Sequence, residues 1–247
     1  MTAAPEAQVV RSATTGEPVR VVERRNRLGI WLCILSDATG VVALLIAYSY
    51  LWSLNVNGAW APPNNAWADP LPFWLITLGA VIVAVLLWWG VKGIKAGNAG
   101  RMVAAATVAL LVVVITFIGQ IVQLSTFPFG PSDGAYASAT FWLCLGACFH
   151  LSLMVTFVLA VLTRTRKGLI STGNPYHAHL VAMFGTWVAI AIFLGSLFAT
   201  TMTTSPNTNS PTFGEFVQAP ASASPAASAA PAASGAASPS PSSSSAG

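Results

Sequence analysis

The chain has 247 residues, of which 55% are hydrophobic and only 7% are charged. Its mean hydropathy of +0.68 lies outside the range of soluble globular domains, which indicates that the bilayer is its solvent. A formal net charge of +4 could suit a nucleic-acid-binding protein. The basic residues instead lie near the ends of apolar stretches, where they bind anionic headgroups, so we exclude a nucleic-acid partner.

Five apolar stretches are long enough to cross the roughly 30 Å of hydrocarbon in a bilayer. They cover about residues 29–54, 71–94, 102–126, 136–163 and 177–203. Lipid offers the backbone no hydrogen-bond partners, so each span must satisfy its own backbone as a helix. The sequence lacks the short alternating segments of a β-barrel. The predicted fold is therefore an all-α, multi-pass membrane protein with five transmembrane helices.

The basic residues all fall on one side of these spans. The loops 55–70 and 127–135 and the segment after residue 203 contain no lysine or arginine. The positive-inside rule therefore predicts a cytoplasmic N-terminus and an external C-terminus. The basic residues precede the first span (Arg11, Arg20, Arg24, Arg25, Arg27), flank the turn between the second and third (Lys92, Lys95, Arg101) or follow the fourth (Arg164, Arg166, Lys167).

The chain divides by composition into three segments. Residues 1–27 are polar and charged, and we expect a flexible cytoplasmic arm. Residues 28–203 form the transmembrane domain. Residues 204–247 are expected to be an external disordered tail, because the sequence from about Gln218 onward is almost entirely alanine, proline, serine and glycine.

Aromatic residues gather near the external ends of the first two spans. Trp52, Trp60, Trp67 and Trp74 have the spacing of an interfacial aromatic belt. Stacking on a cofactor is the alternative interpretation. We favour the belt.

The sequence offers few ligands for a metal or a haem. Cys33, Cys144 and Cys148 all lie inside predicted spans, and without a second ligand pair they indicate small buried hydrophobes rather than a metal site. Of three histidines only His150 lies within a span, so one chain cannot supply two histidines to an intramembrane haem. We therefore predict no catalytic centre, metal or redox cofactor in the chain itself.

Three polar residues on three different spans lie at a similar depth. Asp37 is about 15 Å beyond Arg27, His150 is near the middle of the fourth span, and Thr186 is near the middle of the fifth. An ionised aspartate near the middle of a bilayer costs about 2.5–3.5 kcal/mol on insertion scales, so Asp37 needs a partner.

Two interpretations of Asp37 remain open. Its carboxyl group can accept a hydrogen bond from the neighbouring Ser36 or Thr39, or it can be protonated. Alternatively it belongs to a functional polar layer with His150 that supports proton uptake. Gln120 and Gln123 lie closer to the external surface, where we expect interhelical hydrogen bonds, with a role in a site as the alternative. Ser36 and Thr186 are the other candidates for polar contacts between helices.

The order of these features resembles a known family. The stretches are "WLCILSDATGVVALLIAYSYLW", then "GAWAPP", then "GQIVQLSTFPFGPSDGAYASATFW", followed by His150. They resemble subunit III of the haem-copper terminal oxidases in its five-helix bacterial form, over about residues 30–203. Ser36-Asp37 stands where the family has Ser-Glu.

The most specific match is the family's Ser-Asp-Gly-x-Tyr-x-Ser, which corresponds to residues 132–138, while His150 corresponds to the second histidine of its His-Gly-Leu-His. The first histidine of that motif corresponds to Ala147. The family's third-helix Gln-x-x-Glu corresponds to Gln120-x-x-Gln123. The last-helix Trp-His-Phe-Val-Asp falls on residues 185–189, "GTWVA".

The resemblance implies a two-helix plus three-helix arrangement with phospholipids in the cleft between the groups. It implies a non-catalytic accessory subunit of a cytochrome c oxidase in the bacterial cell membrane, which binds subunits I and II and supports proton uptake during oxygen reduction. Haem and copper would lie in the partner subunits, so the complex would be an oxidoreductase and translocase, while enzymatic activity of the chain itself stays open.

Two alternatives remain. The chain could serve another respiratory assembly, such as a nitric oxide reductase or a supercomplex that includes a cytochrome bc complex. It could also be a small proton-coupled transporter with Asp37 and His150 as its relay. Five spans without paired broken helices speak against the transporter.

Overall fold

The computed structural model describes residues 16–55, 58–172 and 174–206. The chain divides into two units, Met1–Asn209 and Ser210–Gly247, and every described residue belongs to the first. The expected tail therefore lies outside the described residues except for 204–206. The first fifteen residues of the expected cytoplasmic arm lie outside them as well.

Five long helices account for most of the described residues. They are α1 (Val19–Leu54), α2 (Pro70–Lys95), α3 (Ala99–Ser125), α4 (Ala135–Arg166) and α5 (Tyr176–Thr201), and a short 3-10 helix, η2 (Pro63–Asn65), lies between the first two. All five long helices are long and apolar enough to cross a membrane. The described residues contain no β-strand. For the described residues, the prediction of an all-α fold with five helices long and apolar enough to span a membrane is confirmed.

Helix α1 begins earlier than its apolar stretch. It starts at Val19, so residues 19–27 of the expected arm are helical. This segment contains four arginines and a glutamate, which are good helix formers and need no apolar partner. The helix therefore continues without interruption from its apolar part into a charged first part.

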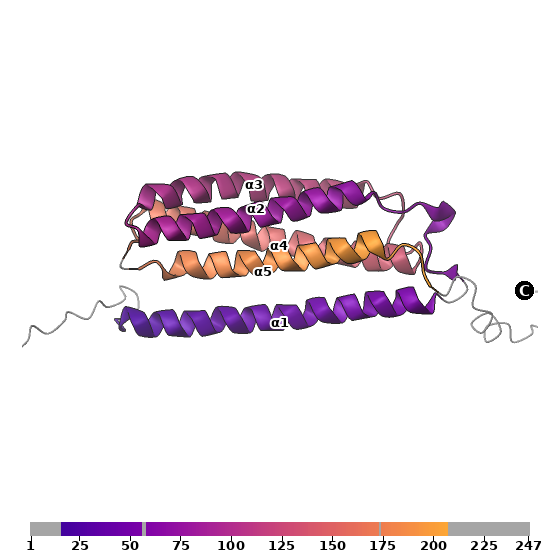
Figure 1. Ribbon diagram of the computed structural model, residues 1–247, viewed down its shortest axis with the longest axis horizontal. Helices are drawn as coiled ribbons and strands as arrows, with labels where there is room; N and C mark the ends of the chain where they lie inside the picture. The colour runs from indigo at the N-terminus through magenta and orange to yellow at the C-terminus, as the bar shows by residue number, and fades with distance from the viewer. Residues whose placement is uncertain (1–15, 56–57, 173, 207–247) are drawn as a thin grey trace, which may run out of the picture. The chain divides into compact units, whose positions relative to one another are not determined.

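Helices α2 to α5 form a four-helix bundle. Helix α2 lies against α3 and α5, and α4 lies against the same two helices (Figure 1). Glycines allow the close approach of α2 to α3. A Cβ atom added at Gly79 would lie 2.2 Å from Oγ1 of Thr116, and one at Gly90 would lie 2.5 Å from Sδ of Met102. Such contacts between small residues are the usual basis of helix packing in membranes.

Helix α1 lies outside this bundle and packs on α5 and α4. In its most apolar stretch 6% of the residues are buried, against 33–44% in the other four helices. The helices therefore group as four plus one, and the expected two-plus-three arrangement was wrong. The reason lies in the connections: residues 96–98 join α2 to α3 and force them together, whereas the longer segment 55–69 lets α1 lie away from α2.

One end of the bundle is covered by the segment between α1 and α2. The backbone N–H groups of Ala135 and Tyr136, at the start of α4, donate to the carbonyls of Ala59 (3.1 Å) and Trp60 (3.2 Å). Gly134 adopts φ +131°, and a Cβ there would lie 3.3 Å from the carbonyl oxygen of Ala59. Only glycine combines this backbone conformation with so close an approach.

An aromatic cluster fills this covered end. Trp60 is 1% exposed and packs edge-on against Tyr48 and Tyr136, whose ring also contacts Trp67 and Phe129. The indole of Trp60 donates to the carbonyl of Thr203 (3.1 Å). Trp60 therefore lies in a core rather than in the interfacial belt expected for it, because its loop folds back over the helix ends.

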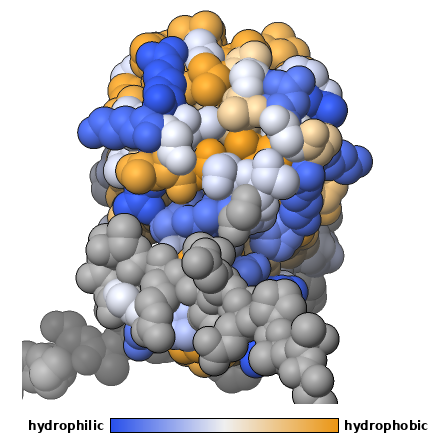
Figure 2. Space-filling view, turned by 90° about the vertical axis from the view of Figure 1, so that its left-hand side faces the viewer, coloured by the Kyte–Doolittle hydropathy of each residue, from blue (hydrophilic) through white to orange (hydrophobic). Residues whose placement is uncertain are grey.

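The opposite end of the helices carries the basic residues. Figure 2 views the molecule from this end and shows hydrophilic residues around an apolar centre. Lys92 and Lys95 occupy the last turn of α2, and Arg164 and Arg166 the last turn of α4. The guanidinium of Arg101 lies 4.5 Å from the ring centre of Trp89, at a distance typical of a cation–π contact.

Candidate functional site

Asp37 is the centre of a polar contact between three helices. Its Oδ2 lies 2.7 Å from Nε2 of His150 on α4 and accepts a hydrogen bond of 2.6 Å from the indole N–H of Trp187 on α5. The His150 side chain is 7% exposed and the Asp37 side chain 27% exposed. The pairing of Asp37 with His150 joins residues that are 113 positions apart in sequence.

The chemistry of this contact suits a carboxylate in a membrane. A carboxylate only accepts hydrogen bonds, an indole only donates them, and an imidazole donates from the nitrogen that carries its proton. Hydrogen bonds to an ionised acceptor are shorter and stronger than neutral ones, and both distances here are short. If the imidazole is also protonated, the pair is neutral overall, which lowers the cost of the carboxylate in lipid.

The local partners considered for Asp37 do not contact it. Ser36 lies on the exposed face of α1. The hydroxyl of Thr39 donates to the carbonyl of Leu35, one turn earlier on the same helix (2.9 Å). The interpretation in which these neighbours satisfy Asp37 was therefore wrong, and so was the expected interhelical contact of Ser36 within the described residues.

Thr186 lies at the expected depth but faces another helix. Its hydroxyl accepts a hydrogen bond from the indole of Trp88 on α2 (2.9 Å) and donates to the carbonyl of Ala182 (2.9 Å). Its neighbour Trp187 contacts Asp37 instead, because consecutive side chains on a helix are about 100° apart. Thr186 does make an interhelical contact, but not with the Asp37–His150 pair.

Trp187 is the functional candidate that the sequence interpretation missed. A signal for it exists, because tryptophan in membrane proteins favours the interfaces, whereas Trp187 is eleven positions into the 26-residue helix α5. A buried indole N–H usually has an acceptor. A tryptophan in the middle of a span therefore indicates a polar partner at the same depth.

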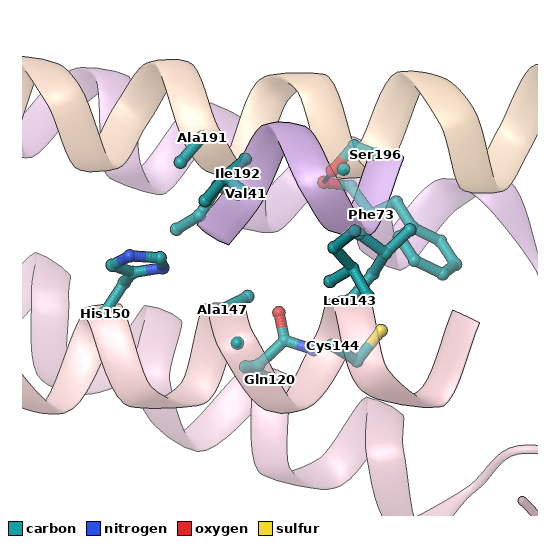
Figure 3. A pocket seen from close by; sticks show the side chains of 13 residues that line it. Val41, Phe73, Gln120, Leu143, Cys144, Ala147, His150, Ala191, Ile192 and Ser196 are labelled. Carbon is teal, nitrogen blue, oxygen red and sulfur yellow. Dashed lines mark hydrogen bonds between the residues drawn. The ribbon is translucent and has the colours of Figure 1, made fainter. Parts of the chain in front are cut away.

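The two glutamines of α3 are buried and contact each other. Nε2 of Gln120 donates to Oε1 of Gln123 within α3 (3.1 Å). The side chain of Gln120 also makes a hydrogen-bond contact with Cys144 on α4, which is an interhelical contact of the kind expected. Nε2 of Gln123 is buried and has no hydrogen-bond partner among the described residues. Gln120 also lines a cavity of about 50 Å³, and His150 and Cys144 line the same cavity (Figure 3).

The described residues contain no group of three or more histidine, cysteine, aspartate or glutamate side chains that could hold a metal ion. All three cysteines are free thiols: Cys33 is exposed, Cys144 is buried, and Cys148 lies between these extremes. The polar site is therefore composed of Asp37, His150 and Trp187, with the cavity beside them.

Comparisons of the chain with protein-family models and with curated proteins find no match. The function of the site is therefore inferred from its own residues and their arrangement.

Proposed function

We propose that this chain is a non-catalytic accessory subunit of a respiratory haem-copper oxidase in a bacterial plasma membrane. It would bind subunits I and II, and the haem and copper would belong to those partners. The N-terminus would lie in the cytoplasm and the C-terminus outside, as the position of the basic residues suggests. The coupled process would be oxygen reduction with proton translocation, to which this subunit contributes support for proton uptake.

The observation that carries this proposal is the meeting of stretches that are far apart in sequence. The three stretches that resemble subunit III, together with His150, come together as two pairs. The Ser36-Asp37 stretch of α1 meets His150 of α4 through the carboxylate–imidazole contact. The loop that contains Trp60 meets the start of α4 at Tyr136. A chance resemblance would not be expected to place its matching residues in contact.

The serine–aspartate–glycine stretch also has a structural reason for its composition. Oδ2 of Asp133 accepts a hydrogen bond of 2.7 Å from the backbone N–H of Gly130, and the hydroxyl of Ser138 donates to the carbonyl of Pro131. These bonds shape the turn before α4. The hydroxyl of Tyr136 then donates to the carbonyl of Ala199, at the end of α5 (3.2 Å). The stretch therefore connects the start of α4 to the end of α5 and to the segment between α1 and α2.

The exposed surface of α1 fits a subunit in contact with lipid or with another membrane protein. An apolar groove runs along the external half of α1 beside Phe198, lined on α1 by Leu45, Ile46 and Tyr50 among others. We propose that a phospholipid chain occupies this groove. It takes the place of the cleft between two groups of helices that the resemblance implied.

The decisive experiment is purification of the full chain, with an affinity tag, from its native membrane in a mild detergent. The expected result is co-purification of two larger subunits with the optical spectrum of haem, while the chain separated from them is colourless. Mass spectrometry of the partners would identify the assembly. Recovery of the chain without any haem-containing partner would overturn the proposal, and recovery with a nitric oxide reductase would reassign it to that complex.

A second experiment tests the role of Asp37 in the assembled complex. Asp37→Asn retains a side chain that can accept hydrogen bonds from His150 and Trp187, so we expect assembly to be unchanged. It removes the charge, so we expect slower proton-coupled turnover, or turnover that decays sooner. If turnover and its decay equal those of the wild type from mildly acidic to mildly alkaline pH, Asp37 is a structural residue only.

A further inference from the structure

A cavity adjoins His150 of the Asp37–His150 pair. It has a volume of about 50 Å³, and all five helices contribute to its lining. Val41 and Leu44, which line it on α1, follow Asp37 in sequence, and Cys144, which lines it on α4, precedes His150. Since α1 and α4 run in opposite directions, the cavity extends from the pair toward the end of the molecule at which α1 ends.

Small side chains leave this space open. Ala147 on α4 faces Ala191 on α5 across the cavity, with His150 at one end of it (Figure 3). Gly146 and Gly195 line the same cavity. A Cβ atom added at Gly146 would meet nothing within 4 Å, and one at Gly195 would meet only Cδ2 of Leu143, at 3.9 Å. The cavity therefore results from the residues that line it.

The lining carries enough polar groups to hold water. His150, Gln120, Cys144 and Ser196 lie around the cavity, and the carboxamide of Gln120 points into it (Figure 3). A buried water needs about 10–15 Å³ of such volume and two to four polar partners, so this cavity has room for roughly three to five molecules. An engineered cavity that stays dry is apolar throughout, which this one is not.

The opposite side of the pair is apolar. Leu151, Met154 and Val158 follow His150 along α4, are at most 1% exposed, and belong to the largest apolar cluster. Ile34, one turn before Asp37 on α1, and Phe184, one turn before Trp187 on α5, belong to the same cluster. The side chains beyond the pair toward the beginning of α1 are thus apolar, whereas the lining of the cavity on the other side includes polar side chains.

We propose that the cavity binds a cluster of water molecules that joins the Asp37–His150 pair to Gln120. The pair is then hydrated from the end at which α1 ends and dry toward the end at which α1 begins. The buried Gln123, whose Nε2 has no partner among the described residues, continues this polar path through its hydrogen bond with Gln120. The inference goes beyond the proposed function and does not depend on which complex the chain joins.

The test is hydroxyl-radical labelling of the full chain, as purified from its native membrane, by X-ray pulses in ¹⁸O-labelled water, followed by mass spectrometry. Radicals formed from bound water modify the side chains beside it. Cys144 is the reporter, since it is 3% exposed and lines the cavity. Met102 and Met154 are the dry references, since they are 0% and 1% exposed and lie in the apolar cluster.

The expected result is modification of Cys144 several-fold above that of the two methionines, after each is divided by the modification of the same side chain in the denatured chain. Ala147→Leu fills the cavity and should lower the modification of Cys144 to their level. Ala160→Leu, on the exposed face of the same helix, is the matched control and should leave it unchanged. Should Ala147→Leu fail to fold, Gly146→Ala is a smaller filling that meets no neighbour and should lower the modification in part.

Two outcomes would overturn the inference. The first is modification of Cys144 no greater than that of Met102 and Met154 in the unaltered chain, which would mean that the cavity is dry or holds a lipid chain. The second is strong modification of Cys144 that neither filling variant reduces, which would mean that the label reaches it by another route. Both outcomes are independent of whether an oxidase partner is found.

Discussion

Helix α1 and the bundle of α2 to α5 are held by different forces. In the bundle, Gly79, Gly90 and Gly93 of α2 let it approach α3 closely. Helix α1 instead uses a few polar and aromatic contacts at separate heights, with Asp37 near its middle and Tyr48 and Trp52 near its end. We therefore expect the bundle to be sensitive to added volume, and the attachment of α1 to be sensitive to the loss of single polar side chains.

The largest difference in stability between variants of the two regions is expected when a glycine is replaced by a larger residue. Gly79→Val places atoms where Thr116 already lies, so we expect the free energy of unfolding to fall by about 3 kcal/mol. Gly40→Val on α1 is the matched control, since a Cβ there meets nothing within 4 Å, and we expect a change within about 0.5 kcal/mol. Unfolding in a denaturing detergent titration measures both. Equal losses would show that α1 is packed as tightly as the bundle.

A double-mutant cycle tests the polar attachment of α1. Asp37→Ala and His150→Ala each remove one partner of the same contact, so we expect a coupling free energy of about 1.5 kcal/mol. Asp37→Ala combined with Thr186→Ala is the control, because Thr186 contacts α2 instead, and their effects should add. Additive effects of Asp37→Ala and His150→Ala would mean that the contact contributes nothing to the attachment of α1.

A smaller effect is expected at Trp187. Trp187→Phe keeps an aromatic ring but removes the N–H that donates to Asp37, so we expect a loss of about 1 kcal/mol in the same unfolding titration. Trp142→Phe, at an exposed position of α4, should change stability little. If the two variants are alike, the indole of Trp187 acts through its size alone.

The smallest effect is expected at the end of α1. The hydroxyl of Tyr48 lies 3.4 Å from that of Thr140, at the long limit for a hydrogen bond, so Tyr48→Phe should cost about 0.5 kcal/mol or less. Tyr50→Phe, whose side chain is exposed, is the control. A loss above 1.5 kcal/mol for Tyr48→Phe, the upper end for a neutral hydrogen bond, would contradict this ranking of the contacts.

The level of a residue along the helices could be predicted from the sequence, but the direction that each side chain faces could not. Depth follows from counting residues along a helix of known rise, which is why Asp37 and His150 were expected at one level and are found in contact. The direction that a side chain faces can be predicted when a helix has one apolar face and one polar face. These helices are apolar all around, so their sequences do not indicate it. Thr186 was therefore assigned to the polar layer, whereas its neighbour Trp187 is the residue of α5 that contacts Asp37.

The grouping of the helices was missed for a related reason. The short turn between α2 and α3 fixes them as neighbours, and this much follows from sequence. The segment 55–69 is long enough to carry α1 to several positions. Aromatic side chains hold this segment over the bundle, with Trp60 at their centre. They contact residues on α1, on α4 and at the end of α5. Those contacts depend on the complete fold.

The sequence separation of the contacts of Asp37 has a consequence for biosynthesis. His150 and Trp187 follow Asp37 by 113 and 150 residues, so at common rates of translation they are made roughly 6–30 s after it. During that interval the first helix is already in or beside the membrane, with its carboxylate apart from both final donors. The contacts that hold Asp37 can therefore form only after α4 and α5 have been synthesised, so the attachment of α1 at this point is a late step in making the protein.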